Sequence, residues 1–191
     1  FEGDLYAGTD GGIYRSSDNG DNFEDLSNTL SISQIYSVAT SKPNSSKLAS
    51  GLQDCGGFGF SVGTWNSYHG GDGMGTAVDP FDEDTYYGFT QYGSQLSVTT
   101  SGGQTSNMYI ASGPVEGQWE TPLQFAKNGE LYSGFDQLYI LNDNNWDSVS
   151  NHNFGSLLRH LEMDPNNTNI IYAATYNEVF KSNDRGETFE L

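Results

Sequence analysis

Two aspartates stand in glycine-rich surroundings where acid–base chemistry could take place. Asp10 lies in Thr9-Asp10-Gly11-Gly12, and Asp54 precedes Cys55-Gly56-Gly57. Glycoside hydrolysis uses two carboxyl groups about 5–9.5 Å apart across the sugar, one as general acid and the other as base or nucleophile. Asp10 and Asp54 are therefore candidate catalytic residues of a glycosidase. The competing interpretation, which we favour, is that both carboxylates accept backbone hydrogen bonds in tight turns.

Four further residues, His69, Asp72, Tyr92 and Tyr176, lie in polar connections between apolar runs. Surface connections often carry binding residues, and tyrosine rings can stack on sugars, although they also pack cores. These four are the predicted ligand-binding face. His69 is followed by Gly70-Gly71 and is expected to be solvated, because one histidine with scattered aspartates lacks zinc-ligand spacing. Calcium held by loop carboxylates is possible, the metal content stays open, and no other cofactor is expected.

The elements that must position these side chains are short strands in a repeating order. Second strands aligned on Tyr6, Leu48, Tyr86, Tyr132 and Tyr172 are about 41 residues apart, the length of a four-stranded unit. First strands ending in polar turns precede four of these positions, as in Leu161–Met163 before Asp164-Pro165. The spacing predicts an all-β repeat protein spanning 1–191, with units at approximately 1–30, 31–68, 69–108, 109–150 and 151–191.

One polar turn, S-x-D-x-G-x-x-F, recurs with fixed spacing. It occurs as Ser16, Asp18, Gly20 and Phe23, and again as Ser182, Asp184, Gly186 and Phe189. Serine and aspartate side chains hydrogen-bond nearby backbone groups, and glycine supplies a positive φ, so these residues are interpreted as structural. A degenerate copy at Thr99–Gly103 has Ser101 in place of the aspartate.

This turn resembles the Asp-box, or BNR repeat, of sialidases, sortilin-type ectodomains and xyloglucan-cleaving endoglucanases. The run from Gly51 to Pro80 is similar to bacterial surface proteins of the xyloglucanase-like and sortilin-like kind, with Cys55 where asparagine usually stands. Thr9–Arg15 resembles, one residue shorter, a segment that carries a catalytic aspartate in the endoglucanases. The resemblance implies a β-propeller of four-stranded antiparallel blades with Asp-box turns. About five blades are expected here, as part of a larger propeller.

Composition excludes several function classes. Seven Lys and Arg against 25 Asp and Glu give a formal net charge of −18, and the basic residues do not cluster, which argues against nucleic acid. Arg15, Arg159 and Arg185 are too scattered for the arginine cluster that a sialidase needs. No apolar run approaches the roughly 20 residues of a membrane-spanning helix. The single Cys55 gives no disulfide framework.

The first unit lacks a first strand and the last ends soon after its polar turn. Further blades of the same polypeptide, or a partner chain, are therefore expected against Leu5-Tyr6-Ala7 and around Val179-Phe180. We expect a secreted or cell-surface binding module for polysaccharide or protein, because no complete catalytic constellation is present. A glycoside hydrolase of the xyloglucan endoglucanase type, using Asp10 and Asp54, is the alternative. Enzymatic activity is not favoured.

Overall fold

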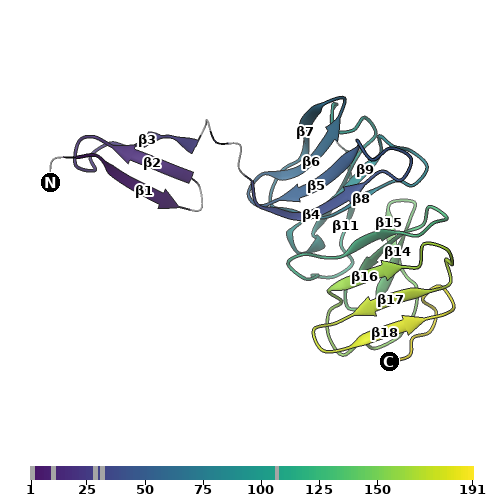
Figure 1. Ribbon diagram of the computed structural model, residues 1–191. Coiled ribbons are helices and arrows are strands. Elements are labelled where there is room, and N and C mark those ends of the chain that lie inside the picture. The colour runs from purple at the N-terminus through teal and green to yellow at the C-terminus, as the bar shows by residue number, and fades with distance from the viewer. Residues whose placement is uncertain (1–2, 10–11, 28–29, 31–32, 106–107) are drawn as a thin grey trace. The chain divides into compact units, whose positions relative to one another are not determined.

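The computed structural model describes residues 3–9, 12–27, 30, 33–105 and 108–191. The chain divides into two units, Phe1–Ser33 and Gln34–Leu191, and each is described by itself (Figure 1). Their strands form antiparallel sheets in which neighbours in space are neighbours in sequence, so the prediction of an all-β chain of antiparallel sheets is confirmed. Within the described ranges there is no helix long and apolar enough to cross a membrane.

The first unit holds one small antiparallel sheet. Its strands are β1 (Leu5–Thr9), β2 (Gly12–Ser16) and β3 (Glu24–Asp25), in that order. Leu5, Tyr6 and Phe23 are all exposed. A three-stranded ribbon has no second apolar layer of its own against which these side chains can be buried.

The second unit contains four sheets that follow one another along the chain. The first comprises β4 (Ile35–Thr40), β5 (Leu48–Leu52), β6 (Gly56–Ser61) and β7 (Thr64–His69). The second comprises β8 (Gly73–Val78), β9 (Tyr86–Thr90), β10 (Gln95–Thr99) and β11 (Met108–Ser112). The third comprises β12 (Leu123–Phe125), β13 (Leu131–Gly134), β14 (Leu138–Asn142) and β15 (Asn145–Ser148). The last comprises β16 (His160–Met163), β17 (Ile171–Ala174) and β18 (Val179–Ser182), extended by a bridge between Lys181 and Glu190.

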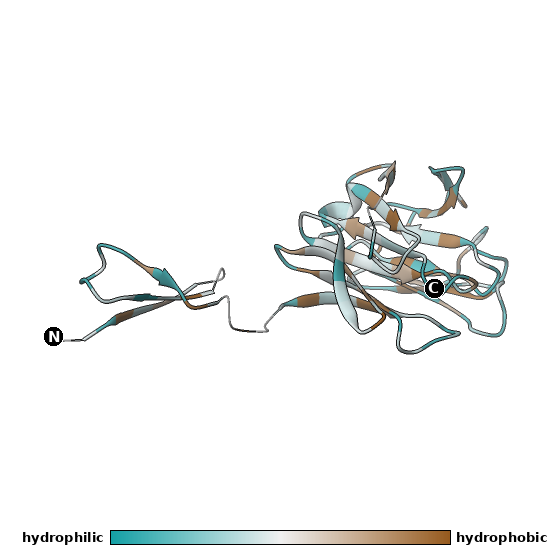
Figure 2. Ribbon diagram, turned by 90° about the horizontal axis from the view of Figure 1, so that it is seen from above, coloured by the Kyte–Doolittle hydropathy of each residue, from teal (hydrophilic) through white to brown (hydrophobic). Residues whose placement is uncertain are grey.

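Apolar clusters join each of these sheets to the next. Ala49 and Tyr68 of the first sheet pack with Val78 and Tyr86 of the second. A larger cluster, which includes Phe89 of the second sheet and Phe135 of the β13–β14 turn, joins the second sheet to the third, and a similar cluster joins the third to the last. Apolar residues are spread along the strands of the second unit (Figure 2), and all six residues of β8 and all four of β13 are buried. Side chains on both faces of these strands are therefore covered, because successive sheets pack face to face.

Antiparallel order divides the connections of the second unit between two ends. Turns joining first to second and third to fourth strands lie at one end, here called the turn end. Turns joining second to third strands, and the segments that lead from one sheet to the next, lie at the other, here called the loop end. The loop end includes the connections 53–55, 70–72, 91–94, 113–122, 135–137, 149–159 and 175–178.

The repeated polar turn has the same hydrogen bonds in both copies. Ser16 Oγ donates to Asp18 Oδ1 over 2.8 Å and accepts from Gly20 N over 2.8 Å. Ser182 does the same with Asp184 at 2.7 Å and Gly186 at 2.8 Å. Bonds from the Asn22 side chain and backbone lower the pKa of Asp18 to about 2. The ionised Asp18 carboxylate thus accepts hydrogen bonds from N–H groups that would otherwise have no partner within the turn.

The two aromatic residues that close these turns lie in different surroundings. Phe189 packs on Phe154 at a ring-centroid distance of 4.9 Å and joins the cluster of the last sheet, whereas Phe23 of the first unit is exposed. In the degenerate copy, Ser101 Oγ replaces the carboxylate and accepts from Thr105 N over 3.0 Å. A hydroxyl therefore preserves this backbone contact without the charge.

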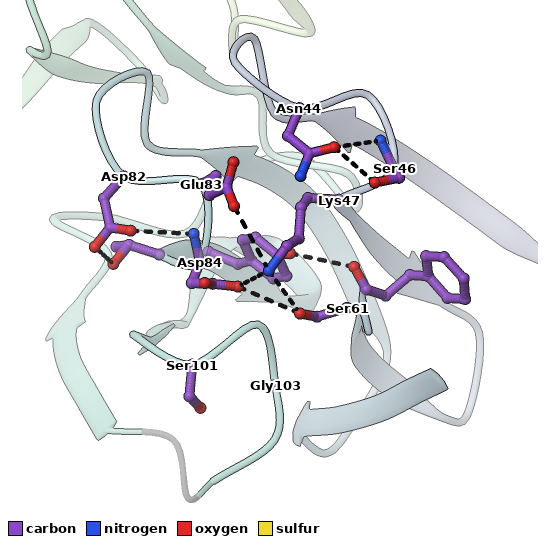
Figure 3. Close-up of polar contacts among 12 residues, drawn as sticks. Asn44, Ser46, Lys47, Ser61, Asp82, Glu83, Asp84, Ser101 and Gly103 are labelled. Atoms are coloured by element: carbon purple, nitrogen blue, oxygen red, sulfur yellow. Dashed lines mark hydrogen bonds and ion pairs between the residues drawn. The ribbon is translucent and has the colours of Figure 1, made fainter. Parts of the chain in front are cut away.

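A largely buried lysine, Lys47, joins the first two sheets of the second unit at the turn end (Figure 3). The Lys47 side chain is 11% exposed and forms an ion pair with Asp84, while Glu83 lies 3.9 Å away. Lys47 Nζ also donates to Ser61 Oγ over 2.8 Å. Because Lys47 and Ser61 belong to one sheet and Asp84 to the β8–β9 turn of the next, this contact fixes the two sheets at their turn ends.

Candidate ligand-binding site

The predicted carboxylate pair is only partly described. Asp10 lies outside the described residues. Asp54 is exposed in the β5–β6 turn at the loop end, with a positive φ of 57°. Its backbone N donates to Asp72 Oδ1 over 2.8 Å. The Asp72 carboxylate thus has the turn-stabilising contact, while the Asp54 carboxylate stays exposed.

Asp72 also connects two sheets at the loop end. Its backbone N donates to Gln91 Oε1 over 3.3 Å, and Gln91 belongs to the β9–β10 turn of the second sheet. The β5–β6 turn, the 70–72 connection and the β9–β10 turn are therefore linked through Asp54, Asp72 and Gln91. This linkage builds one continuous surface from three segments that are distant in sequence.

His69 does not lie in a solvated loop as expected. It is the last residue of β7 and is 5% exposed. The ring fits where two glycines lack side chains: a Cβ added at Gly57 or Gly88 would lie 2.2 or 2.6 Å from His69 Nε2. Tyr68 packs edge-on at 4.9 Å, and Nδ1 lies 3.0 Å from the Gly70 carbonyl oxygen. Sequence alone could not place the ring, because the space is provided by β6 and β9.

Burial lowers the pKa of His69, opposed in part by the Gly70 carbonyl. In the unfolded chain the His69 imidazole takes up a proton near pH 6.5, whereas in the folded chain it does so only at lower pH. The free energy of unfolding should therefore fall as the pH is lowered from 7.5 to 5. Urea unfolding at these two pH values measures the change. His69→Gln should make this pH dependence smaller. An unchanged pH dependence in that variant would show that other groups cause it.

Two aromatic rings meet at the loop end of the second sheet. Tyr92 and Trp119 pack edge-on with centroids 5.2 Å apart, and Tyr36 contacts Trp119 at 6.4 Å. Tyr92 is 40% exposed and Trp119 38% exposed. Tyr92 N donates to Trp119 O over 3.2 Å, and Gly117 N donates to Tyr92 O over 2.9 Å. We call Tyr92 and Trp119 the aromatic platform.

The backbone under the platform rests on Phe135, which is fully buried. A Cβ added at Gly93, Gly113 or Gly117 would lie 2.7, 2.9 or 3.0 Å from the Phe135 ring. Tyr92 has a positive φ of 60°, a conformation that costs a non-glycine residue energy and that the surroundings must enforce. Close packing on Phe135 provides this constraint from the β13–β14 turn of the third sheet.

Two hollows flank Ser94 at the same end. One, of about 480 Å³, is lined by Tyr92, Ser94, Gly113, Val115 and Glu116. The other, of about 430 Å³, lies between the 70–71 backbone and the second sheet. Its polar side chains are those of His69, Thr90, Gln91, Ser94, Gln95, Ser97 and Tyr109. No lysine, arginine, aspartate or glutamate lines this second hollow among the described residues, so its hydrogen-bonding side chains are hydroxyls, amides and the His69 imidazole.

The structure brings together part of the predicted binding face. His69 lines the hydroxyl-rich hollow and Tyr92 lines the other. Asp72 contacts the hydroxyl-rich hollow through its backbone N, which donates to Gln91 Oε1. Tyr176 lies in the β17–β18 turn, 79% exposed, with the Arg159 guanidinium carbon 5.5 Å from its ring centroid. No group of three or more His, Cys, Asp or Glu suited to a metal occurs among the residues that the structure describes.

Sequence reasoning missed Trp119, Tyr109 and the polar residues on β10. Trp119 stands in Gly117-Gln118-Trp119-Glu120, where no periodicity marks it as exposed or buried. The only available signal was a tryptophan inside a connection with two glycines, Gly113 and Gly117. Glycines let the backbone of such a segment pack closely while its tryptophan ring stays exposed. The ring that Trp119 contacts lies on another turn, and sequence spacing cannot predict it.

Comparison with known proteins identifies the fold. No protein-family model matches the sequence, and no curated protein matches it. A GH74 enzyme from Niastella koreensis superposes with a TM-score of 0.63 at 21% identity, over 98% of this chain and 36% of that chain. The GH74 xyloglucanase from Xanthomonas campestris gives a TM-score of 0.59 at 16% identity, over 93% of this chain and 27% of that chain.

A third likeness is to the extracellular domain of a putative hybrid two-component system from B. thetaiotaomicron. It has a TM-score of 0.60 at 14% identity, over 98% of this chain and 26% of that chain. The chain thus spans about a quarter to a third of the length of these structures. Identities this low show the fold alone. Together with the succession of antiparallel sheets, they show that the chain has a β-propeller-like fold.

Proposed function

We propose that this chain is part of a secreted or cell-surface β-propeller whose loop end binds a neutral polysaccharide. The observation that carries the proposal is the aromatic platform of Tyr92 and Trp119 beside a hollow lined mainly by hydroxyls and amides. A sugar presents an apolar C–H face to an aromatic ring and hydroxyl groups at its edge. The platform supplies the first kind of contact, and the hollow supplies the second.

Charge supports a neutral ligand over a polyanionic one. With a formal net charge of −18, the chain repels extended anions at long range. Uncharged sugars experience no such repulsion. Their affinity comes from stacking and hydrogen bonds at short range, which the loop end provides.

The wider architecture belongs to the same proposal. We assign the turns at Ser16–Phe23 and Ser182–Phe189 as Asp-boxes, because the Asp18 and Asp184 carboxylates accept equivalent bonds from the backbone N of Asn22 and Thr188, both 2.9 Å long. The five sheets correspond to blades of a larger propeller. Further blades of the same polypeptide, or a partner chain, complete it. The short span relative to the similar structures supports this assignment.

A glycoside hydrolase is the second candidate. Two of the similar structures are GH74 enzymes, and the Asp54 carboxylate is exposed at the loop end beside the 70–72 connection. Hydrolysis needs a second carboxylate at a defined separation. Asp10 lies outside the described residues, and the carboxylate that the structure places beside Asp54, that of Asp72, accepts the Asp54 backbone N–H over 2.8 Å and has a turn-stabilising role. We therefore prefer binding as the function.

Trp119→Ala should weaken binding of a neutral oligosaccharide about tenfold, because it removes half of the stacking surface. The ligands are cellohexaose and xylohexaose, and isothermal titration calorimetry measures the dissociation constant. Tyr92→Ala should act in the same direction.

The matched control is Trp65→Ala. Trp65 is exposed to a similar degree, at 48%, but follows the β6–β7 turn at the turn end. It should leave the dissociation constant unchanged. Equal losses in the Trp119 and Trp65 variants, or no binding of either oligosaccharide by the wild-type chain, would refute the proposed function.

A further inference from the structure

Basic residues of the second unit are distributed unevenly between its two ends. Six Lys and Arg residues occur between 34 and 191. Lys42, Lys47, Lys127 and Arg185 lie in turns at the turn end, and Lys181 lies within β18. Arg159 alone lies at the loop end, directly before β16, where its backbone N donates to Ala174 O over 2.8 Å. It is therefore the one basic side chain of this unit, apart from histidine, at the end that carries the platform.

Arg159 is supported by an aromatic ring and forms no ion pair within the part of the chain that the structure describes. Its guanidinium carbon lies 5.5 Å from the Tyr176 ring centroid, and both residues are exposed. No carboxylate among the described residues lies within 4.0 Å of the guanidinium, in contrast to Lys47 and Arg185, which are both paired. A guanidinium that stacks on a ring keeps its N–H edge available for a bidentate acceptor.

The connection that carries Trp119 also approaches Arg159. Leu158, the residue before Arg159, donates its backbone N to Phe135 O over 2.8 Å, and the Phe135 ring supports the platform. A Cβ added at Gly134 would lie 2.8 Å from Leu158 Cβ and 3.0 Å from Pro122 Cγ, so the connections that carry Arg159 and Trp119 pack on the same turn. Arg159 therefore adjoins the turn that supports the platform, and a ligand bound at the platform can extend toward the guanidinium.

We propose that Arg159 binds a single carboxylate carried by an otherwise neutral polysaccharide, that is, an acidic sugar such as a uronic acid. This assignment rests on the proposed function and specifies its ligand. A lone guanidinium in a strongly acidic protein can hold one carboxylate by charge-assisted hydrogen bonds at short range, while the surrounding charge repels a polyanion. The platform then binds neutral units, and Arg159 selects chains that carry an acidic unit near them.

The test compares cellohexaose and xylohexaose with the same oligosaccharides carrying one glucuronic acid unit. Calorimetry should show the acidic forms binding about three- to tenfold more tightly, the range of one exposed charge-assisted contact. Arg159→Gln should remove this preference and leave the neutral affinity unchanged, whereas Arg159→Lys should retain part of it. Raising the salt concentration from 20 to 300 mM should reduce the preference by screening.

Lys127→Gln is the matched control, because it removes the same charge from an exposed position at the turn end. It should keep the preference. If the neutral oligosaccharides bind through Trp119 but the acidic forms bind no more tightly, the Arg159 assignment is wrong and the proposed function stands. If neither form binds, both are wrong. A peptide with a free C-terminal carboxylate is also titrated. If it binds more tightly than the acidic oligosaccharides and Arg159→Gln abolishes this binding, the ligand carboxylate belongs to a protein and the acidic-sugar proposal is wrong.

Discussion

Replacing Phe135 by alanine is expected to lower the free energy of unfolding by about 4 kcal/mol and to weaken oligosaccharide binding as strongly as Trp119→Ala. The Phe135 ring is fully buried and contacts Phe89 at 5.9 Å, Tyr139 at 5.7 Å and Trp146 at 6.2 Å. Truncation leaves a cavity at the centre of this cluster. It also removes the surface on which Gly93, Gly113 and Gly117 rest, so Tyr92 loses the support that holds its positive φ.

Urea unfolding and calorimetric titration with cellohexaose measure the two effects. Phe135→Leu is the control, since it fills most of the volume and should cost less than half as much stability. A separate core truncation, Ile171→Ala, affects the fully buried cluster of the last sheet. It should destabilise the fold without changing the dissociation constant measured well below its melting temperature. If Phe135→Ala retained full affinity, Phe135 would not position the platform.

Gly51→Ala is expected to lower the free energy of unfolding by about 3 kcal/mol. A Cβ at Gly51 of β5 would lie 2.2 Å from the Met74 carbonyl oxygen and 2.6 Å from the Gly73 carbonyl carbon on β8. Both contacts are with backbone, which no rotamer change can move away. The first two sheets of the second unit would have to separate locally, which would loosen the cluster around Tyr68 and Tyr86.

Thermal and urea unfolding followed by tryptophan fluorescence measure this loss. Gly70→Ala is the matched control, because nothing lies within 4 Å of a Cβ added there. It should change stability by less than about 0.5 kcal/mol. Similar stability of the Gly51 variant and the wild-type chain would show that the two sheets are not in such close contact.

Much of the sheet organisation could be predicted from the sequence, because it depends on local periodicity. The five aligned positions Tyr6, Leu48, Tyr86, Tyr132 and Tyr172 lie in β1, β5, β9, β13 and β17. Short runs of aromatic and aliphatic residues indicate the strands, their spacing of about 41 residues indicates the repeat, and polar turn residues end each strand. None of these signals needs a distant partner, so one sequence is enough to detect them.

The same reason explains the polar turns. Ser16 and Asp18 are two residues apart, and every bond that they make in the turn is to a residue within four positions. Short side chains at fixed spacing define such a turn before any tertiary packing. The substitution of Ser101 for the aspartate in the degenerate copy does not disturb the pattern, since a hydroxyl also accepts the backbone N–H.

Only the tertiary structure determined the candidate site. Tyr92, Trp119 and Phe135 come from three connections, and Arg159 meets Tyr176 at the loop end of the last sheet, where β16 begins and β17 ends. Whether a side chain in such a connection is exposed or buried depends on residues that approach from other strands. His69 shows this directly: it follows the strand pattern and precedes two glycines, yet it is buried because Gly57 and Gly88 leave space for its ring. Local patterns specify which residues form strands and turns, but they contain no information about the non-local contacts that bring a binding surface together.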